Sequence, residues 1–275
     1  MASKKPSNRK SRSPKQAPRH GLSAFLPDRA IHALTPEPET AVRFLKLVIG
    51  VLLIPLCWVS VETFLILLHA DTWSGNYWKT PEFLSFAIGS AIWLALFYLA
   101  RCRAMMWLYV AGHELTHALF VLICSGKVSK VHISSEGGHI LTNRNNFLIS
   151  LSPYFFPFYT AVTILAWAAL QWIFRDQGGL NPTWLYGTIG FTWMFHLTFT
   201  IWMIRREQPD VEQNGRLFSF SLIFLTNVLL ICAMLIIASP TATFHGLGIS
   251  FWENAKSFHH RLVESAVELM RALSG

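Results

Sequence analysis

Six long apolar stretches constrain the fold of this chain more than any other feature. They lie at about residues 44–69, 83–100, 104–124, 147–174, 183–204 and 217–238. Crossing a bilayer takes about 20 mainly apolar residues in a helix, and only closed hydrogen-bonding structures are stable in lipid. Charged residues make up only 14% of the 275 residues, against about a quarter in soluble domains. The sequence therefore predicts an all-α, multi-pass integral membrane protein with about six transmembrane helices.

The segment before the first apolar stretch is a basic tail, residues 1–43. Ten of the 23 Lys and Arg lie within residues 1–46. Residues 1–20 are rich in Ser and Pro and nearly free of apolar side chains, which predicts disorder. With six spans, the side of the tail carries 16 Lys and Arg and the other side seven, so we expect a cytoplasmic N-terminus. The first 20 residues lack aromatic side chains that could stack on bases, and no nucleic-acid partner is expected.

The last segment, residues 239–275, alternates charged and apolar positions with a helical period. Its apolar members at this spacing are Phe258, Leu262, Ala266, Met270 and Leu273. This pattern predicts an amphipathic helix that lies on the membrane surface or against the other helices. The chain then has three parts, which are the tail, a transmembrane domain at 44–238, and this amphipathic segment.

A short polar segment, "SGKVSKVHISSEGGHILTNRNN", separates the third and fourth apolar stretches. Two runs of β-forming residues flank Gly137 and Gly138, which predicts a β-hairpin. In the fourth stretch, Pro153 and Pro157 remove backbone donors from a helix and predict a bend.

The stretch "AGHELTHAL", residues 111–119, places three ionisable side chains inside the third apolar stretch. Residues four apart share one helix face, so His113 and His117 can present two imidazoles to one metal ion. Zinc is the expected ion, because imidazole suits it. Glu114 follows the first histidine and can act as general base toward water at the metal. Ionisable residues inside a membrane are functional by default.

This motif, the predicted hairpin, "SLSPYFFPFYT" and "QPDVEQNGRLFSFS" together resemble the site-2 protease family of zinc-dependent intramembrane metalloproteases. The resemblance covers about residues 104–238. It implies that His113 and His117 bind zinc, that Glu114 is the catalytic base, and that an aspartate from a later span is the third ligand. Asp210 matches that aspartate best.

Two positions depart from the family pattern. The aspartate of the family stands in an Asp-Gly pair, whereas "VEQNG" follows Asp210 here, and no Asn stands three residues after Pro153. The chain therefore resembles a divergent member. A glutamate as third ligand, Glu207 or Glu212, is the alternative to Asp210.

The function that follows is hydrolysis of a peptide bond in or near a membrane helix, on a membrane-embedded protein substrate in the lipid bilayer. One alternative is a membrane zinc hydrolase that acts on a lipid or a small amide. Another is a non-enzymatic metal-binding protein, such as a transporter or scaffold, in which Glu114 is dispensable.

Other polar side chains in or beside the apolar stretches have structural explanations. We expect Glu62 to pair with a neighbouring helix near the membrane interface and His196 to pack between helices. Asn227 is expected to form a hydrogen bond between helices. His132 and His139 flank the hairpin and are not expected to bind the metal.

Overall fold

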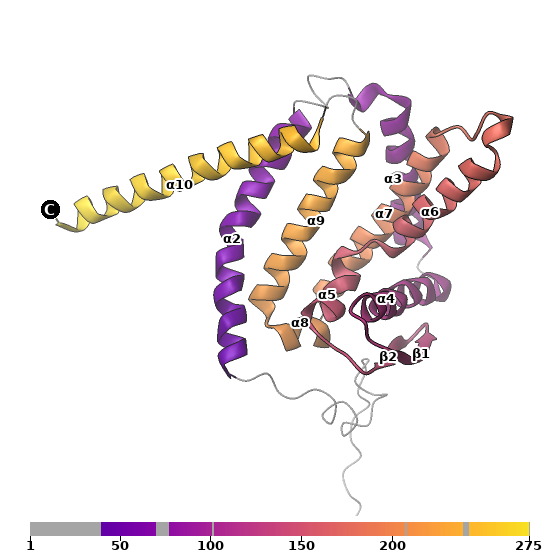
Figure 1. Cartoon of the computed structure of the whole chain (residues 1–275), viewed down its shortest axis with the longest axis horizontal. Helices are drawn as coiled ribbons and strands as arrows, with labels where there is room; N and C mark the ends of the chain where they lie inside the picture. Colours follow the sequence, from indigo (N-terminus) through magenta and orange to yellow (C-terminus); the bar gives the residue numbers. More distant parts are fainter. Residues whose placement is uncertain (1–39, 70–76, 101, 207, 239–241, 275) are drawn as a thin grey trace, which may run out of the picture. The chain divides into compact units, whose positions relative to one another are not determined.

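A computed structural model describes residues 40–69, 77–100, 102–206, 208–238 and 242–274. Most of these residues are helical, and one β-hairpin interrupts the helices (Figure 1). The predicted tail lies outside the described residues up to position 39. Its last four residues, 40–43, are helical, so the first helix begins earlier than predicted.

The elements follow one another as α2 (Thr40–Leu68), η3 (Tyr77–Lys79), α3 (Pro81–Leu99), α4 (Arg103–Ile123), β1 (Val128–Ser134), β2 (Gly137–Thr142), α5 (Phe147–Phe155), α6 (Phe158–Ile173), η4 (Arg175–Gln177), α7 (Thr183–Ile204), α8 (Pro209–Asn214), α9 (Arg216–Ala238) and α10 (Phe244–Ser274). The antiparallel pairing of β1 with β2 confirms the hairpin. A 72° bend between α5 and α6 confirms the break expected from Pro153 and Pro157.

The apolar helices make this a membrane protein. Within the described residues, α2, α3, α4 and α9 are long and apolar enough to cross a membrane, and α5 with α6 is a fifth candidate if the bent pair is one span. The fifth predicted span, α7, is 22 residues long but contains His196 and several threonines among its apolar side chains. Of the six predicted spans, four or five therefore meet the requirement of length and apolarity.

Close contacts join α2 to α9 in a parallel pair. Lys46 Nζ donates to Asn214 Oδ1 at 2.8 Å, just before α9 begins, and Cys57 Sγ lies 3.4 Å from the Ser221 carbonyl oxygen. Gly50 lies against the backbone of Phe218, where an added Cβ would come within 2.8 Å of the backbone nitrogen. Residue numbers rise together along both helices, so both begin at the same end of the pair.

A second parallel pair consists of α3 and α7. Ser85 donates to the Thr183 carbonyl at 2.7 Å, and Trp93 Nε1 donates to Thr198 Oγ1 at 2.8 Å. Between these two contacts, Gly89 leaves no room for a Cβ beside the carbonyl of Gly187. Small residues at such positions let membrane helices approach closely.

The aromatic core lies where α4 meets these helices. Trp93 of α3 packs on Phe195 and Phe199 of α7, and the ring of Tyr109 of α4 stacks on Phe199 with centroids 4.5 Å apart. These contacts hold the middle of α4 in place, which matters because the HELTH residues begin one turn after Tyr109.

Candidate metal centre

Two helices that are distant in sequence bring three possible metal ligands together. His113 and His117 lie one turn apart on α4, and their Nε2 atoms are 3.1 Å apart. Asp210 comes from α8, and its Oδ2 lies 3.6 Å from each of the two Nε2 atoms. The structure therefore assembles the two histidines with the aspartate that the family resemblance selected.

The size of this triangle suits zinc. Zn–N bonds measure about 2.0–2.1 Å in tetrahedral sites, so two ligand atoms of one ion lie about 3.3–3.4 Å apart. The three separations here are 3.1, 3.6 and 3.6 Å. Two imidazoles and one carboxylate also form a donor set typical of catalytic zinc, in which the protein supplies three ligands. The residues present fit the ion.

Each histidine has a partner at its second ring nitrogen. His117 Nδ1 lies 2.8 Å from the carbonyl oxygen of Ile149, and His113 Nδ1 lies 3.2 Å from the hydroxyl of Tyr109. A protonated Nδ1 that donates to these oxygens leaves the lone pair of Nε2 directed at the other ligands. Such partners fix the tautomer and the ring orientation in metal sites.

Asp210 is placed by the short helix α8. Pro209 stands at the start of this helix, where its fixed φ is compatible with the helical backbone. Gly215 follows with a φ of +85°, a conformation that favours glycine and turns the chain into α9.

Hydrogen bonds from Asn214 hold α8 against two other helices. Its Nδ2 donates to Ser150 Oγ of α5 at 2.6 Å and to the Asp210 carbonyl at 2.9 Å, while its Oδ1 accepts from Lys46 of α2. Burial alone would raise the pKa of the Asp210 carboxyl. Its contacts with His113 and His117 lower the pKa by a larger amount, so the net pKa lies below the ordinary value. The carboxylate is therefore ionised, the form that binds a metal.

Tyr154 is a further contact of the site, and the sequence did not reveal it. Its hydroxyl lies 3.4 Å from Asp210 Oδ2, and its ring meets the ring of His113 edge to face at 5.5 Å. Asn227 Nδ2 donates to the backbone carbonyl of Tyr154 at 2.9 Å, which confirms the predicted bond between helices. Tyr109, by contrast, stands four residues before His113, and helical spacing alone identifies it as a neighbour.

Glu114 lies under the hairpin. Only 6% of its surface is exposed. An added Cβ at Gly138 of β2 would lie 2.6 Å from Glu114 Cγ and 2.8 Å from both the His132 carbonyl and Val110 Cγ1. The absence of a side chain at position 138 therefore allows β2 to cover the proposed base.

We expect Gly138→Ala to destabilise the protein by about 1–3 kcal/mol, because overpacking forces its neighbours apart. The melting temperature in detergent measures this change. The matched control is Gly248→Ala in α10, where an added Cβ meets nothing within 4 Å. Equal melting temperatures of the two variants would show that β2 does not press on Glu114.

Neither glutamate proposed as an alternative third ligand joins the two histidines in the described residues. The Glu212 carboxylate is exposed and lies 2.6 Å from the guanidinium of Arg216. Glu207 lies outside the described residues. Within the described residues, Asp210 is the carboxylate that joins the two histidines.

We expect Asp210→Ala to weaken zinc binding by more than about 100-fold, since loss of even an outer-shell partner costs 10–100-fold. Glu212→Ala should bind zinc as the wild type does. Titration of metal-free protein against a competing chelator measures both affinities. If Glu212→Ala loses the metal while Asp210→Ala keeps it, the assignment of the third ligand is wrong.

The remaining candidates have other partners. His132 and His139 face each other across the hairpin, with ring centroids 5.2 Å apart, and neither joins the triangle. Glu62 accepts from Arg261 of α10 at 2.7 Å, which confirms the expected pairing with another helix.

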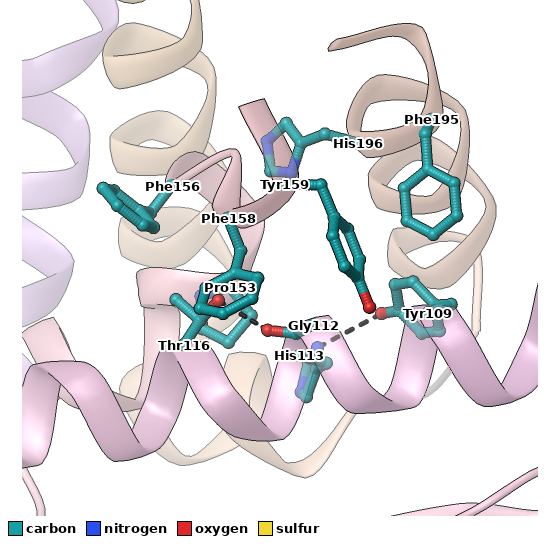
Figure 2. A pocket seen from close by; sticks show the side chains of 10 residues that line it. All are labelled: Tyr109, Gly112, His113, Thr116, Pro153, Phe156, Phe158, Tyr159, Phe195 and His196. Atoms are coloured by element: carbon teal, nitrogen blue, oxygen red, sulfur yellow. Dashed lines mark hydrogen bonds between the residues drawn. The ribbon is translucent and has the colours of Figure 1, made fainter. Parts of the chain in front are cut away.

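A small cavity adjoins His113 on the side of α6 and α7 (Figure 2). Its volume of about 20 Å³ is enough for one water molecule. The lining residues are Tyr109, Gly112, His113, Thr116, Pro153, Phe156, Phe158, Tyr159, Phe195 and His196. His196 of α7 is half-buried, and its ring lies across this cavity from α4 (Figure 2). Its Nε2 atom is buried and has no hydrogen-bond partner among the described residues, so the expectation of a packing histidine with satisfied ring nitrogens is not confirmed.

Comparisons with family models, with curated proteins and with solved structures found no match for this chain. His113, His117 and Asp210 converge on one point, and Glu114 directly follows the first of them in the same helix.

Proposed function

We propose that this protein is a zinc-dependent intramembrane peptidase that hydrolyses a peptide bond in or near a membrane helix. One observation carries the proposal: the ligand atoms of His113, His117 and Asp210 all lie within 4.8 Å of one another, beside Glu114 in an apolar helix. The resemblance of the same residues to the site-2 protease motifs supports a peptide as substrate.

The four side chains have separate roles. His113, His117 and Asp210 would hold zinc, which when bound would polarise a carbonyl and lower the pKa of water to about 7. Glu114 takes a proton from water as the water oxygen adds to the carbonyl carbon. It then passes the proton to the amide nitrogen as the C–N bond breaks. One water is consumed, and one carboxylic acid and one amine are formed.

The surroundings suit hydrolysis within a membrane. The triangle lies between α4, α5 and α8, and β2 covers Glu114, so protein rather than lipid encloses the reacting groups. Water in a protein-lined cavity can reach a bond that lipid would keep dry. Tyr109 and Tyr154 are positioning residues, because they contact ligands and hold their orientation.

Reconstitution into lipid vesicles tests the proposed activity. Zinc-loaded protein is incubated with membrane-spanning peptides that carry labels at both ends, and the products are identified by mass spectrometry. We expect cleavage that stops when a chelator removes zinc and returns when zinc is restored. Hydrolysis of the vesicle lipids or of small amides, with the peptides intact, would instead identify a non-peptide hydrolase. Bound zinc without any hydrolysis would indicate a non-enzymatic metal-binding protein.

A further inference from the structure

The apolar stripe of α10 is covered over only half of the helix. In the first half, Asn254 Nδ2 donates to Thr63 Oγ1 at 3.0 Å, and Arg261 pairs with Glu62, so this half lies on α2. The stripe then continues past Arg261. Its members there are Leu262, Leu269 and Leu273, and they are 52%, 62% and 79% exposed.

The crossing point on α2 lies far from the metal centre. Lys46, near the start of α2, contacts Asn214 of α8, the helix that carries Asp210. Glu62 is 16 residues further along, which corresponds to about 24 Å of helix at 1.5 Å per residue. The hydrocarbon core of a bilayer is about 30 Å thick. The two contacts therefore lie near opposite ends of the apolar part of α2.

The directions of the other helices show which end of each lies on the side of the metal centre. Because α9 runs parallel to α2, it begins beside the metal centre and ends at the far side, where α10 follows. Since α3 follows α2, it returns to the metal side, and α7 runs parallel to α3. Thr160 of α6 contacts Thr192 of α7, and Tyr159 contacts Phe195, so residue numbers run in opposite directions along the two helices. These directions give crossings by α2, α3, α6 and α9, and by α7, which is less apolar than the candidate spans but lies along α3 from Ser85 to Trp93.

The remaining long helix, α4, lies across the metal-side ends of the others. Along α4, Tyr109 meets the last turns of α7, Gly112 meets Tyr159 at the start of α6, and His117 meets Ile149 of α5. Figure 1 likewise draws α4 crossing the direction of α2 and α9. Five crossings place the beginning of α2 and the whole of α10 on opposite sides of the membrane.

Among the described residues, the six-span prediction, which put the tail and the C-terminal segment on one side, divides the basic side chains seven to seven, and this arrangement separates them better. Nine described basic residues fall on the metal side: Arg43, Lys46, Arg103, Lys127, Lys130, Arg144, Arg205, Arg206 and Arg216. Five fall on the other side: Lys79, Arg175, Lys256, Arg261 and Arg271. The six-span prediction differs because an apolar helix that lies across others, as α4 does here, has the same sequence pattern as one that spans. The positive-inside rule makes the metal side cytoplasmic.

We infer that the second half of α10 binds the lipid surface on the membrane face opposite the metal centre, with its leucine stripe in the interface. The helix pairs with α2 at Glu62, less than two turns before α2 ends at Leu68, and the 13 residues after Arg261 extend about 20 Å farther. Trp252 of α10 is 64% exposed, and tryptophan is a residue type enriched at membrane interfaces. A neutral bilayer suffices, because the charges of α10 are balanced. Its acidic residues are Glu253, Glu264 and Glu268, against the bases Lys256, Arg261 and Arg271.

Spin labels on the full chain test the lipid contact. In a variant that lacks the four native cysteines, Leu269→Cys and Glu268→Cys give labels on neighbouring residues of the stripe and of the polar face. In phosphatidylcholine vesicles we expect the label at 269 to be relaxed by oxygen and shielded from a water-soluble nickel complex, and the reverse at 268. Adding phosphatidylglycerol should change neither. Equal exposure of both labels to nickel would overturn the inference. So would dipolar coupling between copies at 269 that persists on dilution in lipid, which would identify a second chain as the occupant.

Sidedness is tested with a membrane-impermeant maleimide on intact cells. Glu136→Cys in the hairpin and Glu268→Cys in α10 should react from opposite sides, the second from outside. Labelling of both from one side would overturn the five-crossing arrangement. The same labelling in the Glu114→Gln background should give the same result, because sidedness does not depend on the proposed base. The labelling therefore tests the position of α10 separately from the proposed peptidase activity, and either can fail while the other stands.

Discussion

Replacement of both His113 and His117 with alanine is expected to reduce bound zinc from about one ion per chain to background. Two of three ligands are lost, and one remaining carboxylate cannot hold zinc against a chelator. The measurement is elemental analysis of protein purified in detergent and passed through a chelating column. The double variant should still elute as the wild type does, because the aromatic contacts that hold α4 are unchanged.

The matched control replaces the two hairpin histidines, His132 and His139, with alanine. These rings contact each other and lie outside the metal triangle, so zinc content should stay at about one ion per chain. If the control loses zinc and the HELTH variant keeps it, the metal lies in the hairpin and the site is wrongly assigned.

Glu114→Gln is expected to lower the rate of peptide cleavage by about 10²–10⁴-fold, the range for loss of a general base, while zinc remains bound. Glutamine has the same shape as glutamate and fits under Gly138, but it cannot take up a proton from water. Initial rates with the peptide found in the vesicle assay, combined with zinc content of the same preparations, measure both effects.

The control for this substitution is Glu136→Gln at the exposed turn of the hairpin, which should leave rate and zinc unchanged. Loss of zinc together with activity in Glu114→Gln would make Glu114 structural. Unchanged activity would mean that no base acts at this position, as in the non-enzymatic alternative.

Local features of this fold were predictable because they depend on neighbours in sequence. The six apolar stretches, the hairpin around Gly137 and Gly138, and the bend after Pro153 all appear as helices, strands and a break near the expected residues. The pairing of His113 with His117 follows from helical spacing alone. Asp210 required the family resemblance, since nothing in its local sequence indicates that α8 folds back onto α4.

Features set by contacts between distant residues were not predictable. The contacts of Gly89 with Gly187 and of Lys46 with Asn214 determine which helices run parallel, and no periodicity encodes them. The same holds for Tyr154, whose role depends on α5 lying between α4 and α9. Apolarity told us which segments avoid water, but not which of them lie across the bundle.

The hydrogen-bond partners of the two histidine Nδ1 atoms differ in how sensitive they are to substitution. The partner of His117 is the main-chain oxygen of Ile149, and every amino acid at that position supplies such an oxygen. The partner of His113 is the phenol of Tyr109, which few side chains can replace. As related sequences drift apart, residue 149 is free to exchange among buried apolar types. Residue 109 is held to tyrosine, or must change together with another group that reaches the same ring nitrogen.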